Sequence, residues 1–224
     1  MIKTVLFDVD NTLLDFKVTA EEVTRDIFKR RGLDFHDNVM PTFFKVSAEL
    51  WLQFEKGEIK QSEIYSQRFK RIFKNLDLAL ECEGFEGEFV KGVFESAHPI
   101  KNSFEILEYL KDKYSLYIVS NASHPQQINR LKICGMLPFF KDVFTSDRMG
   151  YSKPDVRFLD ECFKEIGNVD LSEVLLVGDS LTADISLGKA AKIKTCLFNR
   201  DKKEVDPNSA DYIIEDLIEL KNIL

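Results

Sequence analysis

Two acidic residues follow directly behind the first apolar run of this chain. Residues 4–7 form an unbroken stretch of apolar and β-branched side chains, which is typical of a strand buried on both faces of a parallel sheet. Asp8 and Asp10 then stand at the carboxyl end of this strand, where open α/β sheets place their ligand sites. No basic residue lies between Thr4 and Phe16, so the two carboxylates would repel each other, and a divalent cation is the simplest compensation for their charge. A plain strand followed by a turn is the alternative for this segment taken alone.

Two later apolar runs, 116–119 and 174–177, also end in polar residues, and a lysine stands between them. In chain order the polar residues are Ser120, Asn121, Lys153, Asp179 and Asp184, and Gly178 directly precedes Asp179. Polar groups at several strand ends favour one shared site at the same edge of a sheet. Lys153 precedes Pro154, and Pro154 suits the first position of a helix whose apolar residues recur at helical spacing over 158–166. Gly178 would let the backbone approach the site closely, or would simply form a turn.

The ordered set Asp-x-Asp-x-Thr, Ser-Asn, Lys-Pro and Gly-Asp-x-x-x-x-Asp resembles the four motifs of the haloacid dehalogenase superfamily of aspartate-nucleophile phosphotransferases. The likeness spans essentially the whole length of the chain. It implies that Asp8 is the nucleophile and Asp10 the general acid/base. It also implies a Mg²⁺ site and a phosphate site. The residues implied for the metal are Asp8, Asp10, Asp179 and Asp184, and those implied for phosphate are Thr12, Ser120, Asn121 and Lys153.

Within that superfamily, segments 7–16 and 177–185 are most similar to the pyrimidine 5′-nucleotidases, also called house-cleaning nucleotidases. The tail, with Asn199, Pro207 and the run 212–214, resembles the same branch. This resemblance implies a nucleoside 5′-monophosphatase that prefers pyrimidine to purine nucleotides.

The chemistry of these residues is consistent with phosphoryl transfer without reference to a family. A phosphate monoester is anionic, so a carboxylate can attack its phosphorus only where charge is screened, which Mg²⁺ and Lys153 would do. Attack by Asp8 would give an aspartyl-phosphate and split one displacement into two easier ones. Asp10 would protonate the leaving oxygen and then deprotonate the water that hydrolyses the intermediate. Thr12 is suited to hydrogen-bond a neighbouring carboxylate or the turn backbone.

Hydrophobic periodicity divides the chain into a helical block and an alternating block. Residues 17–97 show apolar residues three and four apart and no strand pattern, with breaks expected at Gly32, near Pro41, at Gly57 and around 84–87. Strands and helices alternate after this block, which is typical of a parallel sheet. The strands expected after the first are 116–119, 142–145, 174–177, 194–198 and 211–214.

We therefore predict an α/β fold, in which a Rossmann-like parallel-sheet core holds an inserted α-helical bundle as a cap domain. The core would comprise residues 1–16 and 98–224, and the cap residues 17–97. Hinged at both junctions, the cap would close over bound substrate and exclude water. In the resembling family such a cap sets substrate choice. The candidates to stack on a nucleobase are Phe43, Phe44, Trp51 and Phe54, of which Phe44 and Trp51 are the first choices. The alternative is that most aromatic residues of this block fill the core of the bundle.

Composition restricts the classes of partner. A net charge of −7 argues against a nucleic-acid surface, which needs a basic patch. The apolar runs are shorter than the ~20 residues of a transmembrane helix, and a strand begins too soon after Met1 for a signal peptide. The four cysteines show no Cys-x-x-Cys spacing. We expect a cytoplasmic enzyme, monomeric or weakly dimeric, that binds a small phosphorylated metabolite and neither a nucleic acid polymer nor a membrane.

Other functions remain open from the sequence. A phosphatase for phosphoglycolate or a sugar phosphate, or a sugar-phosphate mutase, could use the same pair of Asp8 and Asp10. A dehalogenase of this fold would not need an acidic residue at position 10, so Asp10 favours phosphoryl chemistry. A non-catalytic binding protein is the least favoured, because every motif residue is present.

Overall fold

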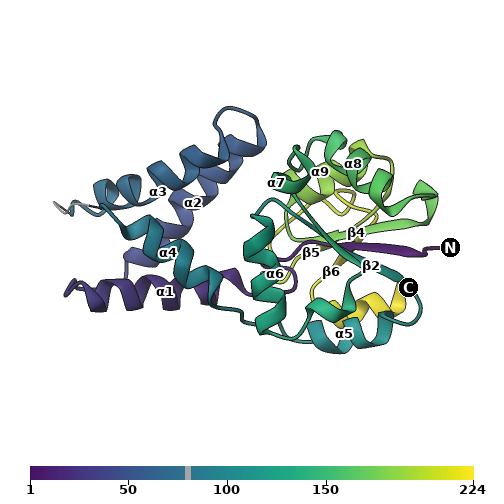
Figure 1. Ribbon diagram of the computed structural model, residues 1–224, viewed down its shortest axis with the longest axis horizontal. Helices are drawn as coiled ribbons and strands as arrows, with labels where there is room; N and C mark the ends of the chain where they lie inside the picture. The colour runs from purple at the N-terminus through teal and green to yellow at the C-terminus, as the bar shows by residue number, and fades with distance from the viewer. Residues whose placement is uncertain (79–81) are drawn as a thin grey trace. The chain divides into compact units, whose positions relative to one another are not determined.

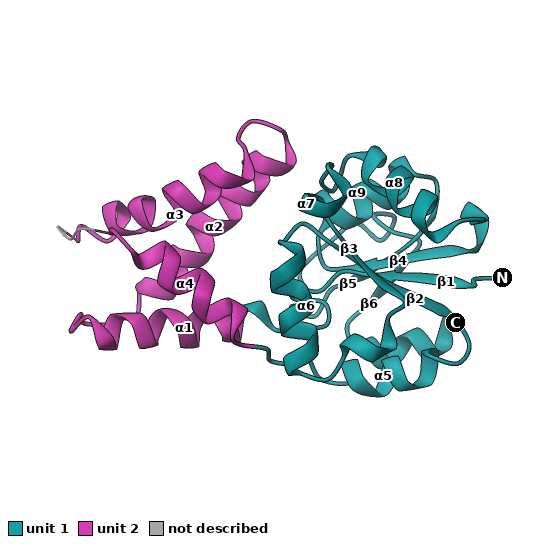
Figure 2. Ribbon diagram, viewed as in Figure 1, with its two compact units in different colours: residues 1–16, 97–224 teal, residues 17–96 magenta. Residues whose placement is uncertain are grey.

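The computed structural model describes residues 1–78 and 82–224. The chain divides into two compact units, which Figure 2 shows in different colours. Unit 1 comprises residues 1–16 and 97–224, and unit 2 comprises residues 17–96. Unit 2 is thus one continuous segment, whereas unit 1 is assembled from both ends of the chain.

Unit 1 contains a six-stranded sheet in the order β3-β2-β1-β4-β5-β6, and every adjacent pair of strands is parallel. The strands are β1 Thr4–Phe7, β2 Ser115–Ser120, β3 Asp142–Thr145, β4 Val174–Gly178, β5 Lys194–Phe198 and β6 Tyr212–Ile214. Each strand predicted from an apolar run is therefore present. The parallel sheet in unit 1 and the helical bundle in unit 2 confirm the predicted α/β class.

The register of the sheet brings the polar strand ends together. Phe7 is paired with Ile118 of β2 on one side and with Val177 of β4 on the other. Asp8 follows Phe7, so its carboxylate lies at the same edge of the sheet as Ser120 at the end of β2. This is the edge at which open α/β sheets bind ligands.

Helices cover both faces of the sheet, as Figure 1 shows. The helices of unit 1 are α5 Ser103–Leu110, α6 His124–Ile133, α7 Ser146–Met149, α8 Val156–Ile166 and α9 Ser186–Ala190. Alternate residues of β1 point to opposite faces: Phe7 packs in a cluster with Leu107 of α5, and Leu6 in a cluster with Phe158 of α8. All four of these side chains are fully buried, which explains why β1 reads as a continuous apolar run.

Two prolines behave differently at helix starts. The expectation that Pro154 occupies the first position of a helix is wrong: α8 begins at Val156, because the Asp155 side chain accepts a hydrogen bond from the Arg157 backbone N–H and caps the helix there. Pro154 lies outside the helix, and the bond between Lys153 and Pro154 is cis. Near Pro41 the break precedes the proline, because α2 begins at Val39 and Pro41 lies in its first turn. Backbone N–H groups in the first turn have no partner within the helix, so a proline there costs no helical hydrogen bond.

Unit 2 is a helical bundle with an aromatic core. Its helices are α1 Phe16–Arg30, α2 Val39–Glu55, α3 Gln61–Asn75 and α4 Phe85–Phe94. The aromatic side chains that are buried there and contact one another are Phe28, Phe43, Phe69, Phe73, Phe85 and Phe89. Phe44 and Trp51 are only half-buried. The aromatic residues of this block are therefore mainly core. Of the four candidates for base stacking, Phe43 belongs to that core, whereas Phe54, like Phe44 and Trp51, is half-buried.

None of the helices in the described ranges has the length and apolar character needed to cross a bilayer. The four cysteines are free thiols. Cys162 in α8 and Cys196 in β5 are buried among apolar side chains, so they contribute to packing as small hydrophobic residues.

Candidate active site

Three carboxylates converge at the carboxyl edge of the sheet. Asp8 follows β1, Asp179 follows β4, and Asp184 lies in a π-helical turn, Leu181–Ile185, just beyond it. One carboxylate oxygen from each lies within 4.8 Å of the others. An all-oxygen, anionic set of donors suits a hard divalent cation such as Mg²⁺ rather than Zn²⁺. The group therefore fits the metal that the sequence motifs imply.

Gly178, the last residue of β4, leaves the space that Asp184 occupies. A Cβ atom at this position would stand 2.2 Å from Asp184 Oδ2. The same oxygen accepts a hydrogen bond of 3.1 Å from the Ser180 backbone N–H. Of the two roles that the sequence left open for Gly178, close approach is the one observed, because a side chain here would displace the carboxylate.

Lys153 supplies the positive charge that the neighbourhood of Asp8 lacks in sequence. Its Nζ donates to Asp8 Oδ1 and to Asp184 Oδ1, each at 2.6 Å, and to the Val119 carbonyl oxygen at 3.0 Å. An ammonium has three protons, so all of its donors point at protein acceptors. A phosphate oxygen that contacts Lys153 must therefore replace one of them.

Charge is not balanced in this group. Burial raises the pKa of Asp8 to about 7, Lys153 opposes the shift, and Asp184 adds to it. Asp179 keeps an exposed edge, yet enclosure by the surrounding protein raises its pKa well above the ordinary value, and the charges of Asp8 and Asp184 raise it further. Burial lowers the pKa of Lys153, but the attraction of Asp184 and Asp8 outweighs it and the net shift is upward. One lysine among three carboxylates leaves an excess of negative charge that a divalent cation would neutralise.

Asn121 and Ser120 follow β2 and have different surroundings. The Asn121 amide accepts from the Lys153 backbone N–H at 2.8 Å and donates to the Lys153 carbonyl oxygen at 2.9 Å. It therefore holds the backbone from which the Lys153 side chain starts. Ser120 is 2% exposed and belongs to a hydrogen-bond network described below. Phosphate contacts by either residue stay predictions.

Thr12 lies in the turn after β1 and is fully buried. Among the described residues, its Oγ1 finds no hydrogen-bond partner, so neither the carboxylate contact nor the turn contact suggested by the sequence is made. A buried hydroxyl without a hydrogen-bond partner lowers the stability of the folded protein, so such a group is typical of a site that binds a ligand. Its phosphate-binding role stays a prediction.

The carboxylate of Asp10 is held by two residues that the sequence motifs do not include. Arg130 Nη1 donates to Asp10 Oδ1 at 2.5 Å, and Gln127 Nε2 donates to Asp10 Oδ2 at 2.8 Å. Lys153 and Arg130 thus bring positive charge to Asp8 and Asp10 from distant parts of the chain, in addition to the charge that a divalent cation would supply. Asp10 does not belong to the converging group of three carboxylates, and its role as a metal ligand stays a prediction.

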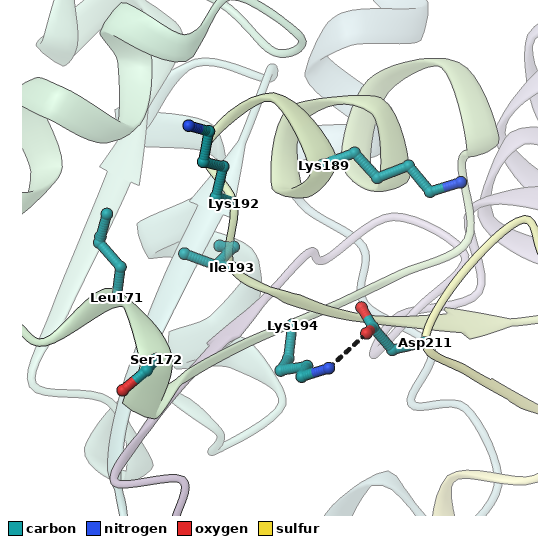
Figure 3. A pocket seen from close by; sticks show the side chains of 7 residues that line it. All are labelled: Leu171, Ser172, Lys189, Lys192, Ile193, Lys194 and Asp211. Carbon is teal, nitrogen blue, oxygen red and sulfur yellow. Dashed lines mark hydrogen bonds and ion pairs between the residues drawn. The ribbon is translucent and has the colours of Figure 1, made fainter.

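A hollow of 370 Å³ lies elsewhere on unit 1, at the amino ends of the strands. It is lined by Leu171, Ser172, Lys189, Lys192, Ile193, Lys194 and Asp211. Figure 3 shows the amino groups of Lys189 and Lys192 pointing away from each other, and Lys194 is paired with Asp211 at 2.7 Å. The positive charges do not converge, so this hollow is not the candidate site.

Comparisons with known proteins agree with this geometry. The profile of the haloacid dehalogenase-like hydrolases matches residues 2–192. YfnB of Bacillus subtilis, described as a HAD-hydrolase, is 32% identical over 99% of this chain and 95% of its own length. Its crystal structure bound to magnesium has a TM-score of 0.93 and covers 100% of this chain and 98% of that chain.

Several relatives have names that state an activity, either pyrimidine 5′-nucleotidase or glyceraldehyde 3-phosphate phosphatase. The pyrimidine 5′-nucleotidase PynA of Streptococcus pneumoniae is 28% identical over 99% of this chain and 97% of its own. A glyceraldehyde 3-phosphate phosphatase of Methanothermobacter thermautotrophicus is 30% identical, with 100% of both chains covered. Together with the profile match over most of its length, these findings show that the chain belongs to the haloacid dehalogenase-like hydrolase family.

Proposed function

We propose that the protein is a Mg²⁺-dependent phosphatase that hydrolyses small phosphate monoesters through an aspartyl-phosphate on Asp8. The observation that carries this proposal is the convergence of Asp8, Asp179 and Asp184 around the buried ammonium of Lys153. The magnesium-bound structure of YfnB supports the choice of metal. Asp8, Asp179 and Asp184 would hold the cation, which supplies screening of the phosphate charge when it is bound.

In the proposed reaction a carboxylate oxygen of Asp8 forms a bond to phosphorus as the bond to the leaving oxygen breaks. Asp10 gives its proton to that leaving oxygen, and the product alcohol departs. A water molecule then attacks the phosphorus of the aspartyl-phosphate while Asp10 takes a proton from it, which releases inorganic phosphate and restores Asp8. Lys153 and Ser120 offset the negative charge on the transferring group.

We further propose nucleoside 5′-monophosphates, pyrimidine before purine, as the preferred substrates. The likeness of the first and last motifs to the nucleotidase branch supports this choice, as does the relative PynA. The half-buried side chains of Phe44 and Trp51 would then stack on the base. A second candidate is glyceraldehyde 3-phosphate, because the relative named for that activity is 30% identical over the full length. A mutase would return the phosphate to a sugar instead of releasing it.

A substrate panel tests both levels of the proposal. The purified protein with Mg²⁺ would be assayed on an aryl phosphate, pyrimidine and purine nucleoside 5′-monophosphates, glyceraldehyde 3-phosphate, phosphoglycolate and a hexose phosphate. We expect release of inorganic phosphate and the highest kcat/KM on a pyrimidine nucleotide. A kcat/KM on phosphoglycolate, a hexose phosphate or glyceraldehyde 3-phosphate that is tenfold above that on every nucleotide would reject the nucleotidase assignment. No phosphate release from any ester would reject the phosphatase itself.

The base-stacking proposal has its own variant. Trp51→Ala should raise KM for a nucleotide several-fold and leave the aryl phosphate almost unchanged, because binding is lost without loss of chemistry. Leu52→Ala, at an exposed apolar position of the same helix, is the matched control and should change neither KM. Equal losses on both substrates for Trp51→Ala would indicate a purely structural role.

A further inference from the structure

Helix α6 carries two polar side chains that are entirely enclosed. Gln127 and Arg130 lie three residues apart and therefore on one face of the helix, and each is 0% exposed. Arginine is rarely fully buried without partners that satisfy its charge. Figure 2 shows α6 within unit 1 beside the ends of the strands, and these two residues form hydrogen bonds to Asp10 and Ser120 at that edge.

The amide of Gln127 has its orientation fixed by its neighbours. Its two Nε2 protons go to Asp10 Oδ2 at 2.8 Å and to Ser120 Oγ at 2.9 Å. Its Oε1 accepts from Arg130 Nη1 at 3.2 Å. The reverse orientation would direct an oxygen at the Asp10 carboxylate and a nitrogen at the guanidinium, so the charges on either side exclude it.

This orientation determines what the Ser120 hydroxyl can do. Ser120 Oγ accepts from Gln127 Nε2 and also from the Ala122 backbone N–H at 3.2 Å. A hydroxyl has two acceptor lone pairs and one proton, so only the donor function of Ser120 remains. No acceptor for that proton is found among the described residues. A phosphate oxygen, which accepts hydrogen bonds, is the complementary partner.

The same pair fixes the carboxylate of Asp10. Arg130 Nη1 holds Oδ1 and Gln127 Nε2 holds Oδ2, so rotation of the carboxylate would break both hydrogen bonds. Arg130 is buried, whereas the Asp10 side chain keeps 27% of its surface exposed, so the rigid partner lies behind and the reactive group faces outward. Gln127 thus connects the residue proposed for proton transfer with a residue proposed for phosphate binding.

We propose that Gln127 and Arg130 are positioning residues that act through Asp10 and Ser120. Arg130 orients Gln127, and Gln127 presents the Ser120 hydroxyl as a donor to the transferring phosphate and holds Asp10 for proton transfer to the leaving oxygen. This inference rests on the proposed phosphatase function. It predicts two separable losses, one in phosphate binding through Ser120 and one in leaving-group protonation through Asp10.

Substrates with different leaving groups separate the two losses. An aryl phosphate with an acidic phenol needs little protonation, whereas an alkyl phosphate depends on Asp10. Arg130→Met should reduce kcat on the alkyl phosphate at least 100-fold and on the aryl phosphate less than 10-fold. Arg130→Lys, which keeps a cation near Asp10, should recover part of the alkyl activity. Lys132→Met, at an exposed position of the same helix, is the matched control and should change neither rate.

Double variants test whether the effects pass through the named residues. Gln127→Leu removes the three side-chain hydrogen bonds of Gln127 at similar volume, and its loss on the aryl phosphate should nearly vanish in a Ser120→Ala background. In an Asp10→Asn background, its loss on the alkyl phosphate should fall to about the size of its loss on the aryl phosphate, because only the effect through Ser120 remains. Gln126→Leu, the half-buried neighbour, is the control. Full additivity in both backgrounds would overturn the proposal.

Crystal structures make the test independent of activity. The Gln127→Leu protein should show a new rotamer of Asp10 or Ser120, while its circular dichroism stays that of the wild type. Both side chains unmoved in that structure, or equal rate losses on the two phosphates, would contradict positioning. If the wild-type protein hydrolyses no ester at all, the proposed function fails, and the structures alone still decide whether Gln127 and Arg130 hold these side chains.

Discussion

In the metal-free protein, burial and the neighbouring charges change the pKa of the Asp8 carboxyl group. Burial raises its pKa to about 7, against an ordinary value of 3.8 that applies in the unfolded chain. Between these two pH values the folded protein binds more protons than the unfolded one. The free energy of unfolding of the metal-free protein is therefore greatest at the acidic end of this window and decreases as the pH rises through 7. Asp179 shifts in the same direction and adds to the effect.

Asp8→Asn should abolish turnover and also alter this pH dependence. The amide cannot form an acyl-phosphate, so we expect less than 1% of the wild-type rate. It carries no charge to bury, so the metal-free variant should unfold at a higher denaturant concentration than the wild type near pH 8 and lose less stability between pH 5 and pH 8. Urea unfolding at several pH values in EDTA measures this. A variant that retains more than a few percent of the activity would disprove the nucleophile assignment.

Gly178→Ala should weaken metal binding without removing any metal ligand. The added methyl group would lie 2.2 Å from Asp184 Oδ2, so the carboxylate must move. We expect the Mg²⁺ concentration for half-maximal activity to rise about 10-fold or more, equivalent to roughly 1.4 kcal/mol of binding free energy. Gly87→Ala is the control, because a Cβ there meets nothing within 4 Å. An unchanged Mg²⁺ requirement in Gly178→Ala would show that Asp184 is not needed at the metal.

At the scale of elements, the site residues that could be predicted are those that stand next to a recognisable strand in the sequence. The run before Asp8 and the polar strand ends were recognisable, because a parallel strand buries consecutive residues and its ligands follow at its end. Gln127 and Arg130 were not, because polar residues on a helix normally mark its solvated face, and only the fold shows that this face meets Asp10. Their spacing of three, in a helix that starts at His124, shortly after Ser120 and Asn121, was the available signal.

The start of α8 shows a second limit. Proline is common in the first helical turn, but the capping side chain of Asp155 competes for the same boundary and determines it. Both residues favour a helix start, so sequence could place this boundary only to within a few positions.

In unit 2, α3 and α4 are joined by a buried ion pair between Arg68 and Glu86, whose side chains are 3% and 20% exposed. The Arg68 guanidinium also lies 4.6 Å from the centre of the Phe89 ring. Burial raises the pKa of Glu86, and Arg68 only partly offsets this. The pair is therefore sensitive to the loss of either partner.

Glu86→Ala should destabilise the protein by about 3 kcal/mol, because the Arg68 charge would stay buried without its partner. The matched control is Glu21→Ala, which breaks the exposed pair of Glu21 and Arg25, with side chains 46% and 56% exposed. That change should cost roughly 0–0.5 kcal/mol. Urea unfolding of both variants measures the difference. An equal decrease in the free energy of unfolding in the two variants would show that the buried pair of Arg68 and Glu86 stabilises the fold no more than an exposed pair does.

At the scale of the whole molecule, metal binding should be visible as stability as well as activity. Mg²⁺ at 100 times its dissociation constant stabilises a folded protein by about 2.7 kcal/mol if the unfolded chain does not bind it. We expect EDTA to abolish phosphatase activity, Mg²⁺ to restore it, and Mg²⁺ to raise the Tm of the wild type.

Asp179→Ala separates this effect from a general influence of salt. The variant should show little Tm increase with Mg²⁺, whereas Asp160→Ala, in α8 and exposed, should respond as the wild type does. Full activity in the presence of EDTA, or an equal Tm response in Asp179→Ala, would contradict a metal site at the three carboxylates.

The points at which the chain leaves and re-enters unit 1 lie side by side. Leu14 and Pro99 form an antiparallel bridge, with hydrogen bonds from the Asp15 backbone N–H to the His98 carbonyl oxygen at 2.7 Å and from the Ile100 N–H to the Leu13 carbonyl oxygen at 2.9 Å. A gene cut at these two places and rejoined through a short turn would encode a chain whose ends already meet, so little entropy of loop closure opposes it. The inserted helices can therefore be exchanged as one unit. A single recombination event could replace them with those of a relative and leave the residues that follow the strands unchanged.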